Sequence, residues 1–177
     1  KELREMSGDG MMDCKKARNE ASGNLEDAID ILRKTGIAKA RKKSGRSAKE
    51  GLVFPYIHPG SKLGVLLEIN CETDFVANTD DFKDLCKDIS MHIAASAPMA
   101  VTREEIPSDI LDREKAIYAD QARQSGKPEN IIEKMTEGRM NKFYQENVLL
   151  EQTFVKDPDK TVSDLIAGTV AKLGRTE

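Results

Sequence analysis

The segment that most constrains this chain is residues 67–78, where an apolar strand pattern passes directly into a polar turn. The apolar run over residues 62–70 has strand length and is typical of a buried strand. The turn that follows places an acid and an aromatic side by side, Asp74 and Phe75. Aromatic residues are only 5% of the 177, so a Phe in a polar turn is unusual. Either Phe75 folds back onto the core, which the sequence alone favours, or it is presented to a partner.

The segments on either side of this turn predict an α+β core. Residues 52–57 are typical of a second strand, and Pro55 makes it an edge or bulged strand. A short turn between the two strands completes a predicted hairpin. A long helix begins at Thr79 or Asp80 and ends before Pro98, because the residue before a proline disfavours helical geometry.

The second half of the chain predicts a helical hairpin followed by extended chain. Residues 108–124 and the helix after them are charged, amphipathic and joined by a short turn, which is typical of antiparallel neighbours. Residues 148–155 are expected to be extended or strand-like, and residues 157–159 to form a turn. Thr161 or Ser163 is expected to cap a last helix.

The first 36 residues predict three short helices with a small core, with Gly36 as a C-terminal cap. Residues 38–50 then carry six Lys or Arg and almost no large apolar side chain, which predicts a helix tail running into a basic, flexible linker. An RNA-binding arm is the alternative, but no aromatic is interleaved to stack on bases. The expected domains are therefore residues 1–37, the linker, and an α+β core over residues 51–177.

Composition and missing motifs favour a binding protein over an enzyme. The net charge is −3, and the three cysteines are odd in number and widely spaced, as expected for reduced thiols. The chain has no glycine-rich phosphate loop, and its two histidines lie in no metal-ligand pattern. No catalytic residue, metal or cofactor is therefore expected, and no run of about 18 apolar residues suggests a membrane span.

Six stretches together resemble the signatures of the elongation factor Ts family: residues 3–17, 67–78, 90–96, 125–128, 137–140 and 150–157. Each alone is weak, but in order they cover essentially the whole chain and are highly specific together. The resemblance implies a ubiquitin-associated-like three-helix N-terminal domain, a basic linker, and a core of a small antiparallel sheet packed with helices and a helical hairpin. It also implies the short form of the family, with one core module, which is expected to form homodimers.

The resemblance implies a guanine-nucleotide exchange factor for elongation factor Tu in translation elongation. It assigns GDP release to a disturbance of the magnesium site of that GTPase by the turn of Thr73, Asp74, Phe75 and Val76. Phe75 would be an apolar wedge between helices of the GTPase, and Asp74 its polar partner near the metal. Thr73 and Val76 would shape the turn.

Five further residues are candidate contacts with the GTPase. His92 lies at the edge of the apolar stripe of the long helix, where a boundary core histidine is the default, whereas the resemblance implies a surface that faces the GTPase. Met11 and Met12 suit either core packing or docking. The resemblance implies docking of the segment that includes Cys14 and Lys15.

The alternative function is a ubiquitin-like or RNA-binding module that uses the N-terminal helices and the basic linker. Direct nucleic-acid binding is not expected, because clustered aromatics are missing. No signal peptide is visible, so we expect a cytoplasmic protein of a bacterium or an organellar equivalent. The resemblance also implies residues before Lys1 and a final sheet strand after Gly174, which leaves the dimer interface open.

Overall fold

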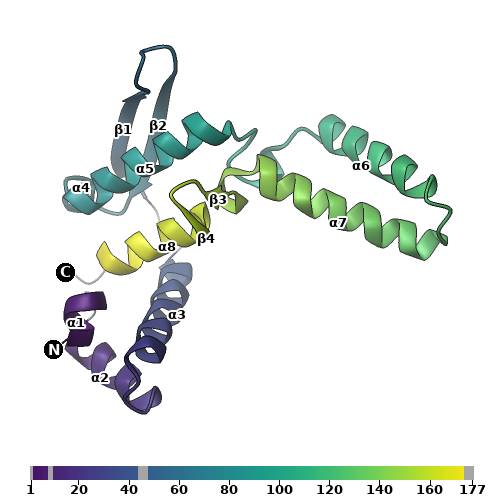
Figure 1. Cartoon of the computed structure of the whole chain (residues 1–177). Helices are drawn as coiled ribbons and strands as arrows, with labels where there is room; N and C mark the ends of the chain where they lie inside the picture. The colour runs from purple at the N-terminus through teal and green to yellow at the C-terminus, as the bar shows by residue number, and fades with distance from the viewer. Residues whose placement is uncertain (1, 8–9, 44–47, 174–177) are drawn as a thin grey trace. The chain divides into compact units, whose positions relative to one another are not determined.

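The computed structural model describes residues 2–7, 10–43 and 48–173, which divide into two compact units (Figure 1). The first unit comprises Lys1–Met91 with Asp164–Glu177, and the second comprises His92–Ser163. The described residues are mostly helical and contain two antiparallel sheets of two strands each. The α+β class predicted from the sequence is confirmed.

Three helices at the N-terminus enclose a small core of their own: α1 (Glu2–Ser7), α2 (Met11–Glu20) and α3 (Leu25–Lys43). Their shared buried residues are mostly small: Leu3, Cys14, Ala17, Ala21, Ala28 and Leu32. Small side chains let the short helices approach closely, which is how so few residues form a core at all.

Helix α3 continues past Gly36 to Lys43, so the prediction of a helix end at Gly36 is wrong. Gly36 is buried inside the helix, and the residues after it are rich in Ala, Lys and Arg, which are strong helix formers. Their summed propensity outweighs the cost of about 1 kcal/mol for one interior glycine. The first part of the predicted linker is thus helical, and residues 44–47 lie outside the described part.

Strands β1 (Glu50–Ile57) and β2 (Gly64–Cys71) form the predicted hairpin in the first unit. The register places Pro55 opposite Leu66. Both strands are edges of a two-stranded sheet, so the missing N–H of a proline is tolerated. The reversal between them is closed by a hydrogen bond from the N–H of His58 to the carbonyl of Leu63, 2.9 Å from N to O.

The two faces of this hairpin differ in burial. The inner face packs on a core cluster formed with the segments that follow β2 and with the last helix; its buried members are Cys71, Ala77, Phe82, Cys86 and Leu173, and its half-buried members are Leu52, Phe54, Ile69 and Val76. The outer face carries Val53, Ile57 and Leu66, all exposed. Apolar side chains gathered on one exposed sheet face are typical of an interaction surface.

A one-turn helix, α4 (Asp74–Ala77), connects β2 to the long helix α5 (Asp80–Ser96). Helix α5 ends at Ser96, and the next residue, Ala97, has a left-handed backbone with φ of 43° directly before Pro98. The last helix, α8 (Val162–Leu173), begins immediately after Thr161, the first of the two predicted start positions. Lys172 of α8 donates to Asp81 of α5, with Nζ and Oδ1 2.6 Å apart.

The second unit is built around the predicted helical hairpin of α6 (Ser108–Arg123) and α7 (Glu129–Asn147) (Figure 1). Four short elements also belong to this unit: η1 (Arg103–Glu105), η2 (Leu149–Glu151), β3 (Thr153–Phe154) and β4 (Asp157–Thr161). The prediction of a turn at residues 157–159 is wrong, because the chain reverses at residues 155 and 156 and β4 starts at Asp157. Pro158 is accommodated because β4 is an edge strand.

A charged clamp joins η1 to η2 at the base of the helical hairpin. The guanidinium of Arg103 donates two hydrogen bonds to the carboxylate of Glu151; Nη2 and Oε2 are 2.6 Å apart. The same guanidinium lies 4.2 Å from the centre of the Tyr144 ring, a cation–π arrangement. Hydrogen bonding to Arg103 lowers the pKa of Glu151 below its ordinary value.

Replacing Gly51 by Ala should destabilise the β-hairpin. Gly51 has a φ of 154°, and a Cβ there would overlap the carbonyl oxygen of Ile69 and lie 2.8 Å from Cα of Asn70. We expect Gly51→Ala to lower the free energy of unfolding by about 2 kcal/mol, measured by urea denaturation. Gly138→Ala is the control, since nothing lies within 4 Å of its added Cβ. The control should gain up to about 1 kcal/mol, and equal stability of Gly51→Ala and wild type would contradict the strand register.

The clamp predicts a pH-dependent stability difference between wild type and Glu151→Gln. Because the pKa of Glu151 is lowered in the folded state, its stabilisation is full above the unfolded value of about 4.3 and is lost as pH falls through the folded pKa. The pair is partly exposed, so we expect less than about 1 kcal/mol at pH 7. Thermal unfolding should give a difference at pH 7 that disappears in stronger acid. A difference that grew on acidification would be inconsistent with the lowered pKa.

Candidate functional site

The turn after β2 is a one-turn helix with a side-chain cap at its N-terminus. Thr73 is extended, with φ of −139° and ψ of 154°, and its hydroxyl accepts the N–H of Val76 at 3.4 Å. A β-branched residue suits extended backbone, and a threonine oxygen satisfies one of the orphan donors of the helix start. Asp74 lies in the first turn, where its charge is favoured by the helix dipole.

The same turn presents Phe75 to solvent. Phe75 is 85% exposed, and its neighbour Asp74 is exposed too. The expectation from sequence alone that Phe75 folds back onto the core is therefore wrong for this structure. The reason is that Val76 and Ala77 occupy the core-facing side of the single helical turn, and residues about 100° apart on a helix cannot all face inward.

Because the Phe75 ring is exposed, it does not contribute hydrophobic burial to the stability of the fold. Burying a Phe side chain is worth roughly 1.5–3 kcal/mol, and the described chain buries phenylalanines elsewhere, at Phe82, Phe143 and Phe154. A large aromatic held out of the core beside an acid is typical of residues that dominate binding energy at protein interfaces. The four turn residues can therefore act as a contact element and carry no nucleophile or base arranged for chemistry.

Two thiols lie directly behind the turn. Cys71 and Cys86 are both buried in the cluster that packs under the hairpin, and neither forms a disulfide. Burial raises the pKa of the Cys86 thiol to about 11. Burial also raises the pKa of Cys71, although backbone hydrogen bonds from the turn act in the opposite direction. These thiols are protonated at neutral pH and behave as small buried groups.

The structure places His92 in the core of the second unit. The side chain is fully buried, with Nε2 2.9 Å from Oε1 of Gln152. Its Nδ1 accepts the N–H of Val155 at 3.3 Å, so Nε2 carries the hydrogen and donates to Gln152. Gln152 in turn donates to the carbonyl of Glu146 at 2.7 Å. A contact between this histidine and a GTPase stays a prediction.

The N-terminal candidates divide between surface and core. Met11 and Met12 are about equally exposed, at 70% and 71%, and Lys15 is exposed as well. Cys14 is buried between the three helices. Met6, which sequence reasoning did not single out as a contact, is also exposed at 60%. Helices α1 and α2 thus present three flexible apolar side chains to solvent.

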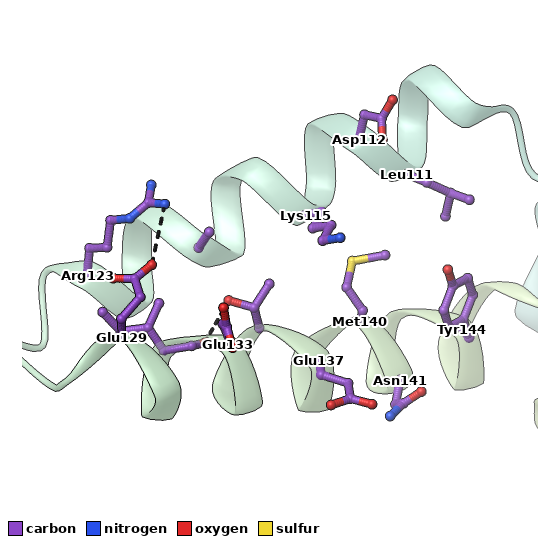
Figure 2. Close-up of a pocket in the computed structure, with 13 residues that line it drawn as sticks. Leu111, Asp112, Lys115, Arg123, Glu129, Glu133, Glu137, Met140, Asn141 and Tyr144 are labelled. Carbon is purple, nitrogen blue, oxygen red and sulfur yellow. Dashed lines mark hydrogen bonds and ion pairs between the residues drawn. The ribbon is translucent and has the colours of Figure 1, made fainter.

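An open groove of about 740 Å³ lies between the two helices of the helical hairpin (Figure 2). Its apolar lining includes Leu111, Ile132, Met140 and Tyr144, and charged side chains surround it: Asp112, Lys115, Arg123, Glu129, Glu133 and Glu137. No histidine or cysteine lines the groove. Lining of this kind can hold side chains of a partner, but it offers no nucleophile–base pair.

Nowhere in residues 2–7, 10–43 and 48–173 do three or more His, Cys, Asp or Glu side chains gather so that they could hold a metal ion. No helix within the same ranges is long and apolar enough to cross a membrane.

Three supporting residues of the turn were not identified as functional from the sequence. The sequence predicts Thr79 only as a possible start of the long helix and assigns no role in the turn to the side chains of Cys71 and Asn78. In the structure each bonds to the turn through its side chain. The available signal was position: polar side chains directly after a short helix are the ones that can bond its free carbonyls.

Comparison with known proteins gives one consistent result. The sequence profile of the family described as Elongation factor TS matches residues 2–176. An elongation factor Ts of Geobacter sulfurreducens is 59% identical over 173 residues, which cover 98% of this chain and 80% of the relative. Those of Fervidobacterium nodosum and Thermoanaerobacter pseudethanolicus are each 58% identical over 174 residues, covering 98% of this chain and 88% and 85% of the relatives.

Proposed function

Since the chain belongs to the elongation factor Ts family, we propose that it promotes GDP release from elongation factor Tu during translation elongation. The observation that carries the proposal is the capped turn that holds Phe75 and Asp74 in solvent. An exchange factor needs a shaped contact element and no catalytic acid or nucleophile. The cytoplasm, or the matrix of an organelle, is the compartment where this activity would be used.

Exchange follows from thermodynamic linkage between two ligands of the GTPase. If the protein binds the nucleotide-free GTPase more tightly than the GDP form, GDP must bind the complex more weakly by the same factor. Each ~1.4 kcal/mol of coupling weakens GDP binding tenfold. The protein therefore needs contacts whose energy differs between the two states, not contacts that are merely strong.

Magnesium gives such a contact a sensitive target. Mg²⁺ requires near-ideal octahedral geometry, so a small displacement of the groups around it is costly. We assign Phe75 as the wedge that inserts between helices of the GTPase and Asp74 as the polar group that acts near the metal site. Thr73 and Val76 shape the turn, Thr73 through its cap and Val76 through its packing.

The N-terminal helices form the second part of the proposal. Helices α1 to α3 surround a core of their own, which supports a ubiquitin-associated-like domain over residues 1–37. The exposed Met11, Met12 and Lys15 are the residues through which it would dock on the GTPase. Cys14 packs in the core beneath that surface. Residues 51–177 are the proposed core domain.

A second copy of the chain is the proposed occupant of the outer face of the β-hairpin. That face exposes Val53, Ile57 and Leu66, the last at 75%. A two-stranded hairpin is marginally stable on its own, and the described residues add no third strand to it. Packing the outer faces of two hairpins against each other would bury apolar surface that each copy leaves in water.

Replacing Phe75 by Ala should abolish most exchange without unfolding the protein. The ring is solvent-exposed, so the melting temperature should stay within about 2 °C of wild type. Release of labelled GDP from elongation factor Tu should slow by roughly 30-fold, the factor that corresponds to about 2 kcal/mol of lost interface energy. Ile117→Ala, a truncation of a partly exposed residue on α6, is the control. It should accelerate GDP release from elongation factor Tu as much as wild type does. Exchange by Phe75→Ala within twofold of wild type would refute the wedge.

The homodimer is tested by Leu66→Lys. A lysine ammonium on the outer face would have to be desolvated at the dimer interface, and a buried leucine contact would be lost. Sedimentation equilibrium should show a dimer for wild type and at least about tenfold weaker association for the variant. Ile117→Lys on the helical hairpin is the control and should leave association unchanged. Equal weakening by both variants, or a monomeric wild type, would count against this interface.

A further inference from the structure

The direction of Phe75 depends on side chains that do not themselves reach the surface of the turn. Helix α4 is only four residues long, and so short a helix has no stability of its own in water. Unsupported, the turn would sample conformations in which the ring lies against apolar groups nearby. Something must therefore hold these four residues in place before a partner arrives.

We propose that Cys71 and Thr79 are positioning residues that hold the turn, with Phe75 and Asp74 outward, in the free protein. The inference rests on the exchange function proposed above and adds residues that would act on the GTPase only through Phe75. Cys71 supports the turn from inside, and Thr79 fixes its end to helix α5.

Cys71 supports the turn through one hydrogen bond and through packing in the core. The thiol donates to the carbonyl of Thr73 with Sγ and O 3.1 Å apart, and Cys71 belongs to the same buried cluster as Ala77. Thr73 is the N-cap and Ala77 the last residue of α4. One buried side chain thus bonds the start of a single helical turn and lies in the core cluster that holds its end, which restricts the residues between them.

Thr79 joins the turn to the next helix through its hydroxyl. The hydroxyl donates to the carbonyl of Val76 at 2.7 Å and accepts the N–H of Phe82 at 3.3 Å. A hydroxyl can donate and accept at once, whereas a valine of the same shape can do neither. Phe82 is buried in the core under the hairpin, so this bridge ties the C-terminal end of α4 to a fixed point.

Holding Phe75 in its binding orientation in the free protein reduces the free-energy cost of binding. Ordering a mobile segment at an interface costs free energy at the moment of binding. A turn already held in its bound direction avoids most of that cost, and a contact element displaced by about 1 Å can lose up to about a hundredfold in rate. Loosening the support should therefore slow exchange even when Phe75 itself is intact.

The first test compares two cysteines of the same core cluster. Cys71→Ala and Cys86→Ala each remove one buried thiol beneath the hairpin, but only Cys71 bonds the turn. We expect Cys71→Ala to slow GDP release from elongation factor Tu by about tenfold or more relative to Cys86→Ala. Cys71→Ser, whose hydroxyl can donate to the carbonyl of Thr73, should recover at least half of the lost rate on a logarithmic scale.

The second test compares two threonines. Thr79→Val removes the bridge, and Thr169→Val removes a hydroxyl that bonds only a carbonyl of its own helix, Leu165. We expect the first to slow GDP release by about tenfold and the second to leave the rate unchanged. Thr79→Ser keeps the bridging hydroxyl and should exchange nucleotide close to the wild-type rate.

Amide hydrogen exchange of the free protein separates this inference from the proposed function. The N–H groups of Ala77, Asn78 and Thr79 are bonded within the turn, and local opening exposes them to exchange. They should exchange about tenfold faster in Cys71→Ala and Thr79→Val than in the two control variants. Equal protection in all variants would overturn the positioning roles even if wild type releases GDP. If the two variants show faster amide exchange but even the wild-type protein does not accelerate GDP release, only the proposed function is refuted.

Faster amide exchange combined with wild-type GDP release would also overturn the inference, because a loosened turn would then suffice for activity. A loss of GDP release shared equally by Cys71→Ala and Cys86→Ala would have the same consequence, since it would assign the effect to the core cavity. Support requires that the amide and GDP-release effects appear together in Cys71→Ala and Thr79→Val and be absent from their controls.

Discussion

The packing of Val76 and Ala77 under the β-hairpin determines that the neighbouring Phe75 is exposed to solvent. These two residues anchor the turn to the cluster of Cys71, Phe82 and Cys86. With that side of the single helical turn occupied, Phe75 has no core to enter and stands in solvent. The hairpin, helix α5 and helix α8 together make the surface on which the anchor rests. The exposure of Phe75 is thus a consequence of how the core is packed.

The hairpin, the long helix and the helical hairpin were predictable from the sequence, because apolar periodicity and Pro, Gly and cap residues define them locally. The end of α3 was not, since one glycine predicted a stop that Ala, Lys and Arg then overrode. The direction of Phe75 was predictable only by family resemblance, because it depends on which neighbours occupy the core. His92 lay at the edge of a stripe, where only the bond to Gln152 shows on which side the side chain falls.

The proposed activity needs little chemistry but considerable rigidity. A wedge changes the nucleotide affinity of a GTPase only through the difference in its contacts between two states. A flexible wedge would adapt to both states and discriminate poorly between them. The capped, sulfur-supported and hydroxyl-bridged turn is the kind of element that keeps one shape. Burial keeps its sulfur protonated, so the support is insensitive to pH near neutrality.

We propose that this turn acts on the magnesium site of the GTPase, so GDP release that the protein stimulates should depend on magnesium. The rate of GDP release from elongation factor Tu would be measured with and without the protein, first in millimolar Mg²⁺ and then in excess EDTA. If the turn acts by disturbing the metal site, we expect a large acceleration by the protein in Mg²⁺ and a much smaller one in EDTA, because the chelator would already have removed the ion. An equal acceleration in both conditions would contradict it.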